Sequence, residues 1–167
     1  MTIRIAPMSL ENAASFRACL DSVARERRYL AQIEAKPLAD IVEFMRTSVA
    51  NDAVQFVALD NEQVVGWADI FPSWAHAVAH CGTLGMGVLA PFRGRGIGTQ
   101  LLVASIAKAE QKGITRIELE ARIDNTAAIR LYQRVGFVHE AVKKNALRFD
   151  DKYYDAAQMR LLIGNAC

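Results

Sequence analysis

The segment FRGRGIGTQLL (92–102) places three glycines among two arginines directly before apolar residues with helical spacing. Glycine costs about 1 kcal/mol relative to alanine inside a helix, so the bare backbone must serve another purpose. Main-chain N–H groups at a helix N-terminus lack internal partners, and the helix dipole adds about half a positive charge there. The pattern predicts a cradle for a phosphate or pyrophosphate. Its residues are Arg93, Gly94, Arg95, Gly96, Ile97, Gly98 and Thr99.

Two other phosphate-binding motifs fit this region poorly. A P-loop requires a lysine before the helix, and the segment has none. A dinucleotide fingerprint could be placed on Gly85, Gly87 and Ala90, but Pro91 follows where the helix should begin. The remaining alternative is a glycine-rich turn that binds nothing, although one turn rarely needs three glycines.

A second group of residues lies about 30 positions downstream. Asn125, Ala128 and Tyr132 are spaced i, i+3 and i+7, which places them on one face of one helix. A tyrosine hydroxyl in a cleft can act as a general acid, whereas in a core it is a buried ring with an incidental polar partner. Spacing alone does not choose between these two interpretations.

Two acidic residues, Glu118 and Glu120, project from the same side of a predicted strand. Either could serve as a general base. The alternative is that they form ordinary charged pairs with Arg116 and Arg122 on a polar strand face.

The elements that must position these residues follow from hydrophobic periodicity. Glycines 113 and 136 are placed to end two of the helices, and Asp124 or Asn125 to begin the second of these. The order predicts one α/β domain over residues 1–167: a mixed, mostly antiparallel sheet of about seven strands with helices on both faces. The predicted strands are 2–6, 54–60, 63–71, 79–89, 115–121, 137–149 and 152–163, and the predicted helices are 9–27, 38–49, 97–112 and 124–136.

Composition narrows the class of protein. The chain has 167 residues, 52% of them hydrophobic, which suits one compact domain. A net charge of +2 argues against a general nucleic-acid binder. No apolar run is long enough to span a membrane, and no secretory signal is expected at the N-terminus. Three dispersed cysteines, Cys19, Cys81 and Cys167, predict reduced thiols and a cytoplasmic protein.

A metal site is not expected. His76, His80 and Cys81 offer three potential ligands, but they lie on a loop-to-strand segment where this spacing does not converge. A structural or substrate-side role is the better interpretation, with His80 as a reserve candidate for the base.

Together the two motifs resemble the GNAT superfamily of acetyl-CoA-dependent N-acetyltransferases. Arg93-x-x-Gly96-x-Gly98 matches its [QR]-x-x-G-x-[GA] signature, with Val88 and Pro91 in the preceding family positions. Downstream, the family segment N-x-x-A-x-x-L-Y-x-x-x-G-F is matched by Asn125, Ala128, Leu131, Tyr132, Gly136 and Phe137.

The resemblance implies acetyl-CoA as donor and roles for particular residues. The backbones of Met86, Gly87 and Val88 would bind the pantetheine arm, and Asn125 and Ala128 would line the cofactor cleft. Tyr132 would protonate the departing thiolate and Glu120 would act as base, with Glu118, His80 or a water chain as alternatives. Glycines 82, 85 and 87 predict a bulged strand that allows close approach of the cofactor.

The acceptor is expected to be a primary amine of a small molecule, favoured as an amino acid α-amine. Such amines have a pKa near ~8, so a modest base suffices. The C-terminal K-x-x-A-x-R and Y-x-D-x-x-x-M patterns, beginning at Lys143 and Tyr153, resemble amino-acid and phosphinothricin-type acetyltransferases. Alternatives are acetylation of a protein N-terminus, or a non-catalytic acyl-CoA-binding domain. Homodimers are common in such families, but no interface is evident. The aromatic residues Trp67, Trp74, Tyr153 and Tyr154 are candidates for the acceptor pocket.

Overall fold

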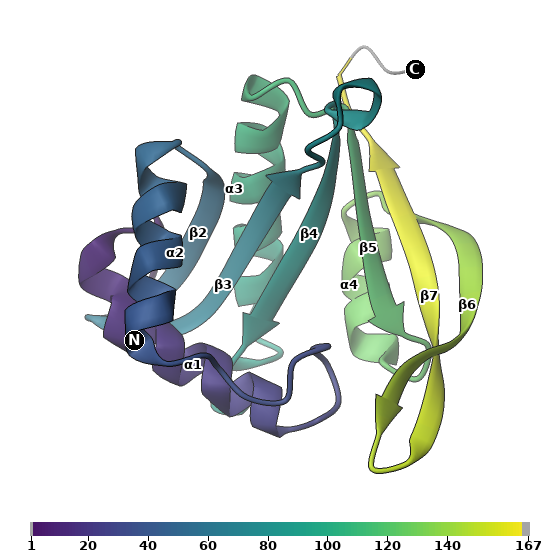
Figure 1. Ribbon diagram of the computed structural model, residues 1–167, viewed down its shortest axis with the longest axis horizontal. Coiled ribbons are helices and arrows are strands. Elements are labelled where there is room, and N and C mark those ends of the chain that lie inside the picture. Colours follow the sequence, from purple (N-terminus) through teal and green to yellow (C-terminus); the bar gives the residue numbers. More distant parts are fainter. Residues whose placement is uncertain (1, 165–167) are drawn as a thin grey trace.

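The computed structural model describes residues 2–164 and contains one twisted sheet (Figure 1). Within these residues seven strands pair in the order β1-β2-β3-β4-β5-β7-β6. Only β4 and β5 pair in parallel, so the predicted mixed and mostly antiparallel sheet is confirmed. The strands are β1 (Ile3–Pro7), β2 (Val54–Asp60), β3 (Gln63–Pro72), β4 (Cys81–Val88), β5 (Arg116–Arg122), β6 (Val138–Phe149) and β7 (Lys152–Leu162).

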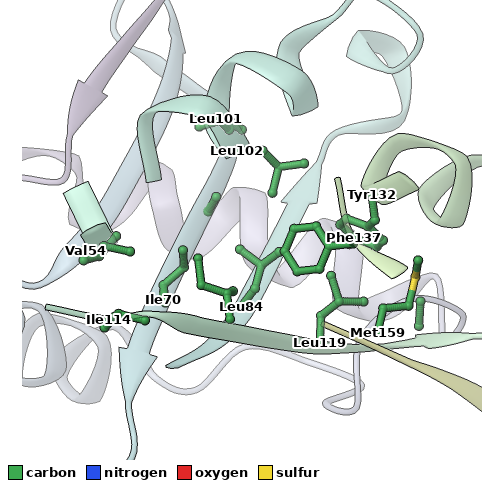
Figure 2. Packing of buried hydrophobic residues seen from close by; sticks show 14 of the residues in the cluster. Val54, Ile70, Leu84, Leu101, Leu102, Ile114, Leu119, Tyr132, Phe137 and Met159 are labelled. Atoms are coloured by element: carbon green, nitrogen blue, oxygen red, sulfur yellow. The ribbon is translucent and has the colours of Figure 1, made fainter. Parts of the chain in front are cut away.

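Two helices cover each face of the sheet (Figure 1). On one face, α1 and α2 bury Phe16 and Met45 against the β2–β3 hairpin. On the other face, α3 and α4 pack over β3, β4 and β5, and Figure 2 shows Tyr132 and Phe137 beside Leu119 in this core. The helices are α1 (Ala13–Arg25), α2 (Leu38–Ala50), α3 (Ile97–Gln111) and α4 (Thr126–Arg134).

The helix ends follow the local signals in the sequence. Gly113 and Gly136 have positive φ angles of 81° and 104° just beyond α3 and α4, as expected of glycines that end helices. Asn125 is the N-cap of α4 because its side chain accepts a hydrogen bond from the Ala128 N–H at 3.3 Å. The helix predicted over 9–27 is shorter, since a 3-10 turn at Leu10–Asn12 precedes α1.

The parallel pairing of β4 with β5 is confined to Cys81, Gly82 and Thr83. Beyond Thr83, β4 continues to pair with β3 as far as Val88 while β5 turns away towards β7. The two strands diverge in Figure 1 accordingly. The main chain of residues 84–88 therefore lacks a strand partner on its β5 side.

The prediction that β4 is bulged was wrong. The β3–β4 register runs without a shift from Gly66–Val88 to Pro72–Gly82. The glycines instead make room for side chains of the neighbouring strand: a Cβ at Gly87 would lie 2.3 Å from the Trp67 ring. A Cβ at Gly85 would lie 3.0 Å from the Asp69 carboxylate. Both β3 side chains thus lie over β4.

Gly87→Ala should lower the free energy of unfolding by about 1–3 kcal/mol, because the added methyl group overlaps the buried Trp67 ring. Urea denaturation would measure this loss. In a Trp67→Leu background the same change should cost less, because the ring is gone. An equal cost in both backgrounds would show that the Trp67 ring does not restrict position 87.

Candidate acetyl-donor cavity

A cavity of about 480 Å³ opens where β4 and β5 diverge, between α3 and α4. It brings together residues from four separate segments of the chain, including every predicted cofactor-binding residue except Arg95. Glu120 also lines it. The predicted residues on its wall are Met86, Gly87, Val88, Arg93, Gly94, Gly96, Ile97, Gly98, Thr99, Asn125, Ala128 and Tyr132.

The loop before α3 is built from left-handed glycines. Gly94 and Gly96 have φ angles of 73° and 77°, and a Cβ at either would meet nothing within 4 Å. Gly96 is the N-cap of α3, so the first N–H groups of the helix lack intrahelical partners, and the residues that carry them line the cavity. Gly98 has a different purpose, because a Cβ there would lie 2.8 Å from the Leu131 side chain of α4.

The two arginines of the loop differ in position, because Arg93 lines the cavity and Arg95 does not. Arg93 Nε donates to the Val88 carbonyl at 2.8 Å, and its two terminal nitrogens bind the Glu26 carboxylate at 2.9 and 2.6 Å. Its guanidinium also lies 4.7 Å from the Tyr29 ring centroid. Arg93 therefore fastens the loop to the end of α1, and the bonded Glu26 carboxylate raises its pKa. Arg95, outside the cavity wall, lies over the Phe92 ring.

Tyr132 occupies the cavity wall and the core at once. Its side chain is 9% exposed, and its ring meets Phe137 edge-on with centroids 5.8 Å apart. Burial raises the pKa of its hydroxyl to about 12. At neutral pH the phenol is therefore protonated, the state required of a proton donor.

The two carboxylates of β5 both form ion pairs. Lys143 Nζ donates to Glu120 Oε1 at 2.5 Å, and both side chains are about half exposed. Glu118 pairs with Arg116 at 3.3 Å and does not line the cavity. His80 is exposed at the opposite end of β4 from Met86 and lies beside Cys81. Among residues 2–164, no three His, Cys, Asp or Glu side chains gather as metal ligands.

Several cavity residues carry no motif of their own in the sequence. Tyr29 follows α1, and Arg130 and Arg134 lie one turn apart on α4. Their i, i+4 spacing on the same helix as Asn125 was the available signal. These two exposed arginines add positive charge to the cavity wall. The other wall residues not predicted are Val23, Phe92, Ala121, Ala127 and Leu131.

The four aromatic candidates for the acceptor pocket are not brought together. Trp67 is buried against Phe16, with ring centroids 5.8 Å apart, whereas Trp74 is 97% exposed in the β3–β4 loop. Tyr153 is exposed, and Tyr154 lies under the Arg122 guanidinium at 3.9 Å. None of the four lines the cavity. Trp67 packs in a core, as aromatic residues in strands usually do, and the role of the four residues in an acceptor pocket stays a prediction.

The C-terminal motif residues form ion pairs in the β6–β7 hairpin. Asp155 accepts hydrogen bonds from Lys144 Nζ at 2.8 Å and from the Asn145 N–H at 3.0 Å. Arg148 pairs with Asp151, next to the predicted turn at Asp150–Asp151. Arg148 and Asp155 of the pattern thus have their partners within the hairpin.

A buried carboxyl group that the sequence did not single out lies on β3. Asp69 is largely buried, and desolvation raises its pKa to about 7, with the Gly85 main chain opposing that rise. A carboxyl group with such a pKa exchanges protons near neutral pH, which makes the group a functional candidate.

Comparison with known proteins agrees with this geometry. Residues 17–137 match the model of the acetyltransferase (GNAT) family, and the chain belongs to that family. Proteins of this family use acetyl-CoA as the acetyl donor. The two sequence motifs that resemble the family thus both contribute residues to the cavity wall.

Individual relatives match in part or throughout. N-alpha-acetyltransferase 30 of Schizosaccharomyces pombe is 35% identical over 83 residues, which are 49% of this chain and 55% of that protein. The matches span between a quarter and about half of the curated relatives' lengths.

Two solved structures superpose over nearly the whole chain. A GNAT acetyltransferase of Streptococcus pneumoniae has a TM-score of 0.90 and 25% identity, covering 98% of this chain and 100% of its own. A phosphinothricin acetyltransferase of Sinorhizobium meliloti, solved with acetyl-CoA, has a TM-score of 0.88 and 18% identity, covering 98% and 90%. The second likeness shows the fold alone. No helix within residues 2–164 is long and apolar enough to cross a membrane.

Gly96→Ala should weaken the affinity for coenzyme A about tenfold, or about 1.4 kcal/mol, because the methyl group enters the space before the α3 N–H groups. Isothermal titration calorimetry would measure the change. Gly113→Ala is the matched control: its φ of 81° imposes the same backbone strain, and a Cβ there also meets nothing within 4 Å. Gly113 lies outside the cavity, so this control should bind normally. If both variants bind coenzyme A with equal affinity, the pyrophosphate does not bind at the N-terminus of α3.

Proposed function

We propose that the protein transfers the acetyl group of acetyl-CoA to the primary amine of a small molecule, with an amino acid α-amine as the favoured acceptor. One observation carries this proposal. The N-terminus of α3, the unpaired edge of β4 and the Tyr132 side chain line a single cavity. These are three parts that an acyl-CoA transferase needs: an anion site, a site for the arm and a proton donor.

The donor would enter the cavity from the α3 loop. Its pyrophosphate would accept hydrogen bonds from the main-chain N–H groups that follow Gly96, with Arg130 and Arg134 adding positive charge. The pantetheine amides would pair with the free edge of β4 at Met86–Val88, as an added strand would. This path directs the thioester towards Tyr132.

Acetyl transfer by direct attack requires a neutral amine, a stabilised oxyanion and a proton for the departing sulfur. Tyr132 would supply that proton, and its raised pKa keeps the phenol protonated until the thiolate forms. Glu120 would act as a base on the amine, directly or through water, from its place on the cavity wall. Its half-exposed pair with Lys143 leaves it open to exchange.

The preference for an α-amine rests on basicity and on resemblance. An α-amine with a pKa near ~8 needs far less help to lose its proton than a lysine side chain near ~10.4. The C-terminal patterns beginning at Lys143 and Tyr153 are similar to those of enzymes that modify free amino acids.

A protein N-terminus is the second candidate, favoured by the 35% identity to N-alpha-acetyltransferase 30. A thiol-release assay with free amino acids and with short peptides of free N-terminus separates the two. Turnover of amino acids supports the proposal, and turnover of peptides alone supports the second candidate. Binding of acetyl-CoA without turnover of any amine would indicate a non-catalytic acyl-CoA-binding domain.

Tyr132→Phe should lower kcat about 100-fold or more, because the leaving thiolate loses its proton donor. The dissociation constant for acetyl-CoA should change less than about twofold, since phenylalanine preserves the ring packing. Steady-state kinetics and calorimetry would measure the two quantities. A variant with wild-type kcat would remove Tyr132 from the mechanism.

A further inference from the structure

The two faces of the sheet are chemically different where β4 and β5 diverge. Met86 and Val88 of β4, with Leu119 and Ala121 of β5, point into the core beneath α3 and α4. Side chains of alternate residues point to the opposite face, on the side of α1 and α2. Gly85 and Gly87 of β4 and Glu120 of β5 therefore belong to that second face, which an acceptor could approach.

Asp69 belongs to this same face. It precedes Ile70 and follows Ala68, both of which lie in the α3 and α4 core, and it alternates with them. Trp67, two residues earlier, packs in the other core beneath α1 and α2. Asp69 is therefore on the side of the sheet that carries Glu120.

The strand register puts these two carboxylates in one row. Asp69 pairs with Gly85 across β3 and β4. Thr83 pairs with Glu118 across β4 and β5, so two residues further along these strands stand Gly85 and Glu120. Two strand steps span about 10 Å, before the divergence of β4 and β5 widens the row. Because Gly85 has no side chain, no side chain at position 85 stands between the two carboxylates.

The Asp69 carboxyl leans over the bare position. A Cβ at Gly85 would lie only 3.0 Å from Asp69 Oδ1, so this oxygen occupies the space above β4. The side chain keeps partial exposure and is therefore not sealed in the core. Asp69 itself does not line the cavity between β4 and β5, and its carboxyl lies over Gly85 of β4, the strand between Asp69 and the strand of Glu120.

No charged side chain neutralises Asp69 from the elements around it, within residues 2–164. Its partner on β2 is Gln55, which is neutral and buried with no hydrogen bond to its side-chain amide. Its partner on β4 is a glycine. The helix α2 turns Ile41, Met45 and Ser48 towards the sheet, and its charged residues Asp40, Glu43 and Arg46 are exposed.

We propose that Asp69 is a second carboxylate of the acceptor site and takes a proton from the amine, opposite Glu120. This role rests on the proposed acetyl transfer. An ammonium group between the two carboxylates is attracted by both, and a group on β3 would then be a catalytic residue of the reaction. The site would then include residues of three strands, β3, β4 and β5.

Two carboxylates account for both protons that the acceptor nitrogen loses. Asp69 takes the first proton, which converts the ammonium ion into a neutral amine. The nitrogen attacks the thioester carbonyl and forms the C–N bond, Glu120 takes the second proton, and the C–S bond breaks as Tyr132 protonates sulfur. The Tyr132 phenolate regains a proton from Glu120 through solvent, and Asp69 releases one proton to water. The products are an amide, coenzyme A and one proton.

The test compares Asp69→Asn with wild type in amine acetylation across pH 5.5–9.5, a range set to bracket a group that titrates near neutrality. Asparagine keeps the shape of aspartate but cannot take a proton. We expect the substitution to lower kcat/KM about 100-fold at pH 7.5. The rise of kcat/KM with pH near pH 7, expected for wild type, should be absent from the variant. The dissociation constant of acetyl-CoA, measured by calorimetry, should stay at the wild-type value.

Asp60→Asn is the matched control, because it makes the same chemical change at a partly exposed aspartate at the end of β2, outside the row and the cavity. It should keep the wild-type pH profile. A wild-type profile in Asp69→Asn would overturn the role of Asp69 while leaving the acetyl transfer intact. Failure of the wild-type protein to acetylate any amine would overturn the proposed function, and this role with it.

Thermal unfolding gives a readout that does not depend on activity. A carboxyl whose pKa rises on folding binds more protons in the folded state, so its contribution to stability is lost as pH rises from about 4 to about 7. Asp69→Asn should therefore raise the melting temperature relative to wild type more at pH 8 than at pH 4. A difference independent of pH would contradict the desolvated carboxyl on which the proposal depends.

Discussion

The structure depends on a main chain that is left unpaired. β4 pairs with β5 over three residues only, and the edge of β4 from Leu84 to Val88 then has no neighbouring strand. Main-chain N–H and C=O groups that are removed from water need hydrogen-bond partners. The unpaired edge of β4 in the cavity is therefore suited to bind a ligand that carries amide groups. The loop before α3, the face of α4 and the lean of Trp67 and Asp69 over glycines are all arranged around this edge.

In the proposed reaction the two substrates would approach the gap between β4 and β5 from opposite faces of the sheet. The cavity opens where β4 and β5 diverge and reaches both Tyr132 of α4 and Glu120 of β5. The side chains of Asp69 and Glu120 belong to the face of the sheet that α1 and α2 cover. The divergence of β4 and β5 beyond Thr83 would let the two substrates meet. Binding each substrate on its own face allows the amine and the thioester to meet at one point, which is how orientation accelerates a two-substrate reaction.

Local sequence patterns predicted the order of the elements, the helix ends at Gly113 and Gly136 and the cavity residues that belong to the two motifs, but not Tyr29, Arg130 or Arg134. They failed where a residue's partner comes from a distant segment. The Arg93 side chain binds Glu26, 67 positions away, and Gly87 is small because of Trp67 on the next strand. Asp69 carries no motif, and its environment exists only once β3 and β4 are paired.

The bidentate pair between Arg93 and Glu26 has a consequence for the order of events in a catalytic cycle. The same guanidinium grips the last residue of β4 and the end of α1, so these two segments cannot shift independently. A molecule that displaces the α1 end must also disturb the carbonyl of Val88 beside the cofactor loop. By thermodynamic reciprocity, if a ligand at the α1 end changes the affinity for the cofactor through this pair, the cofactor changes the affinity for that ligand by the same factor.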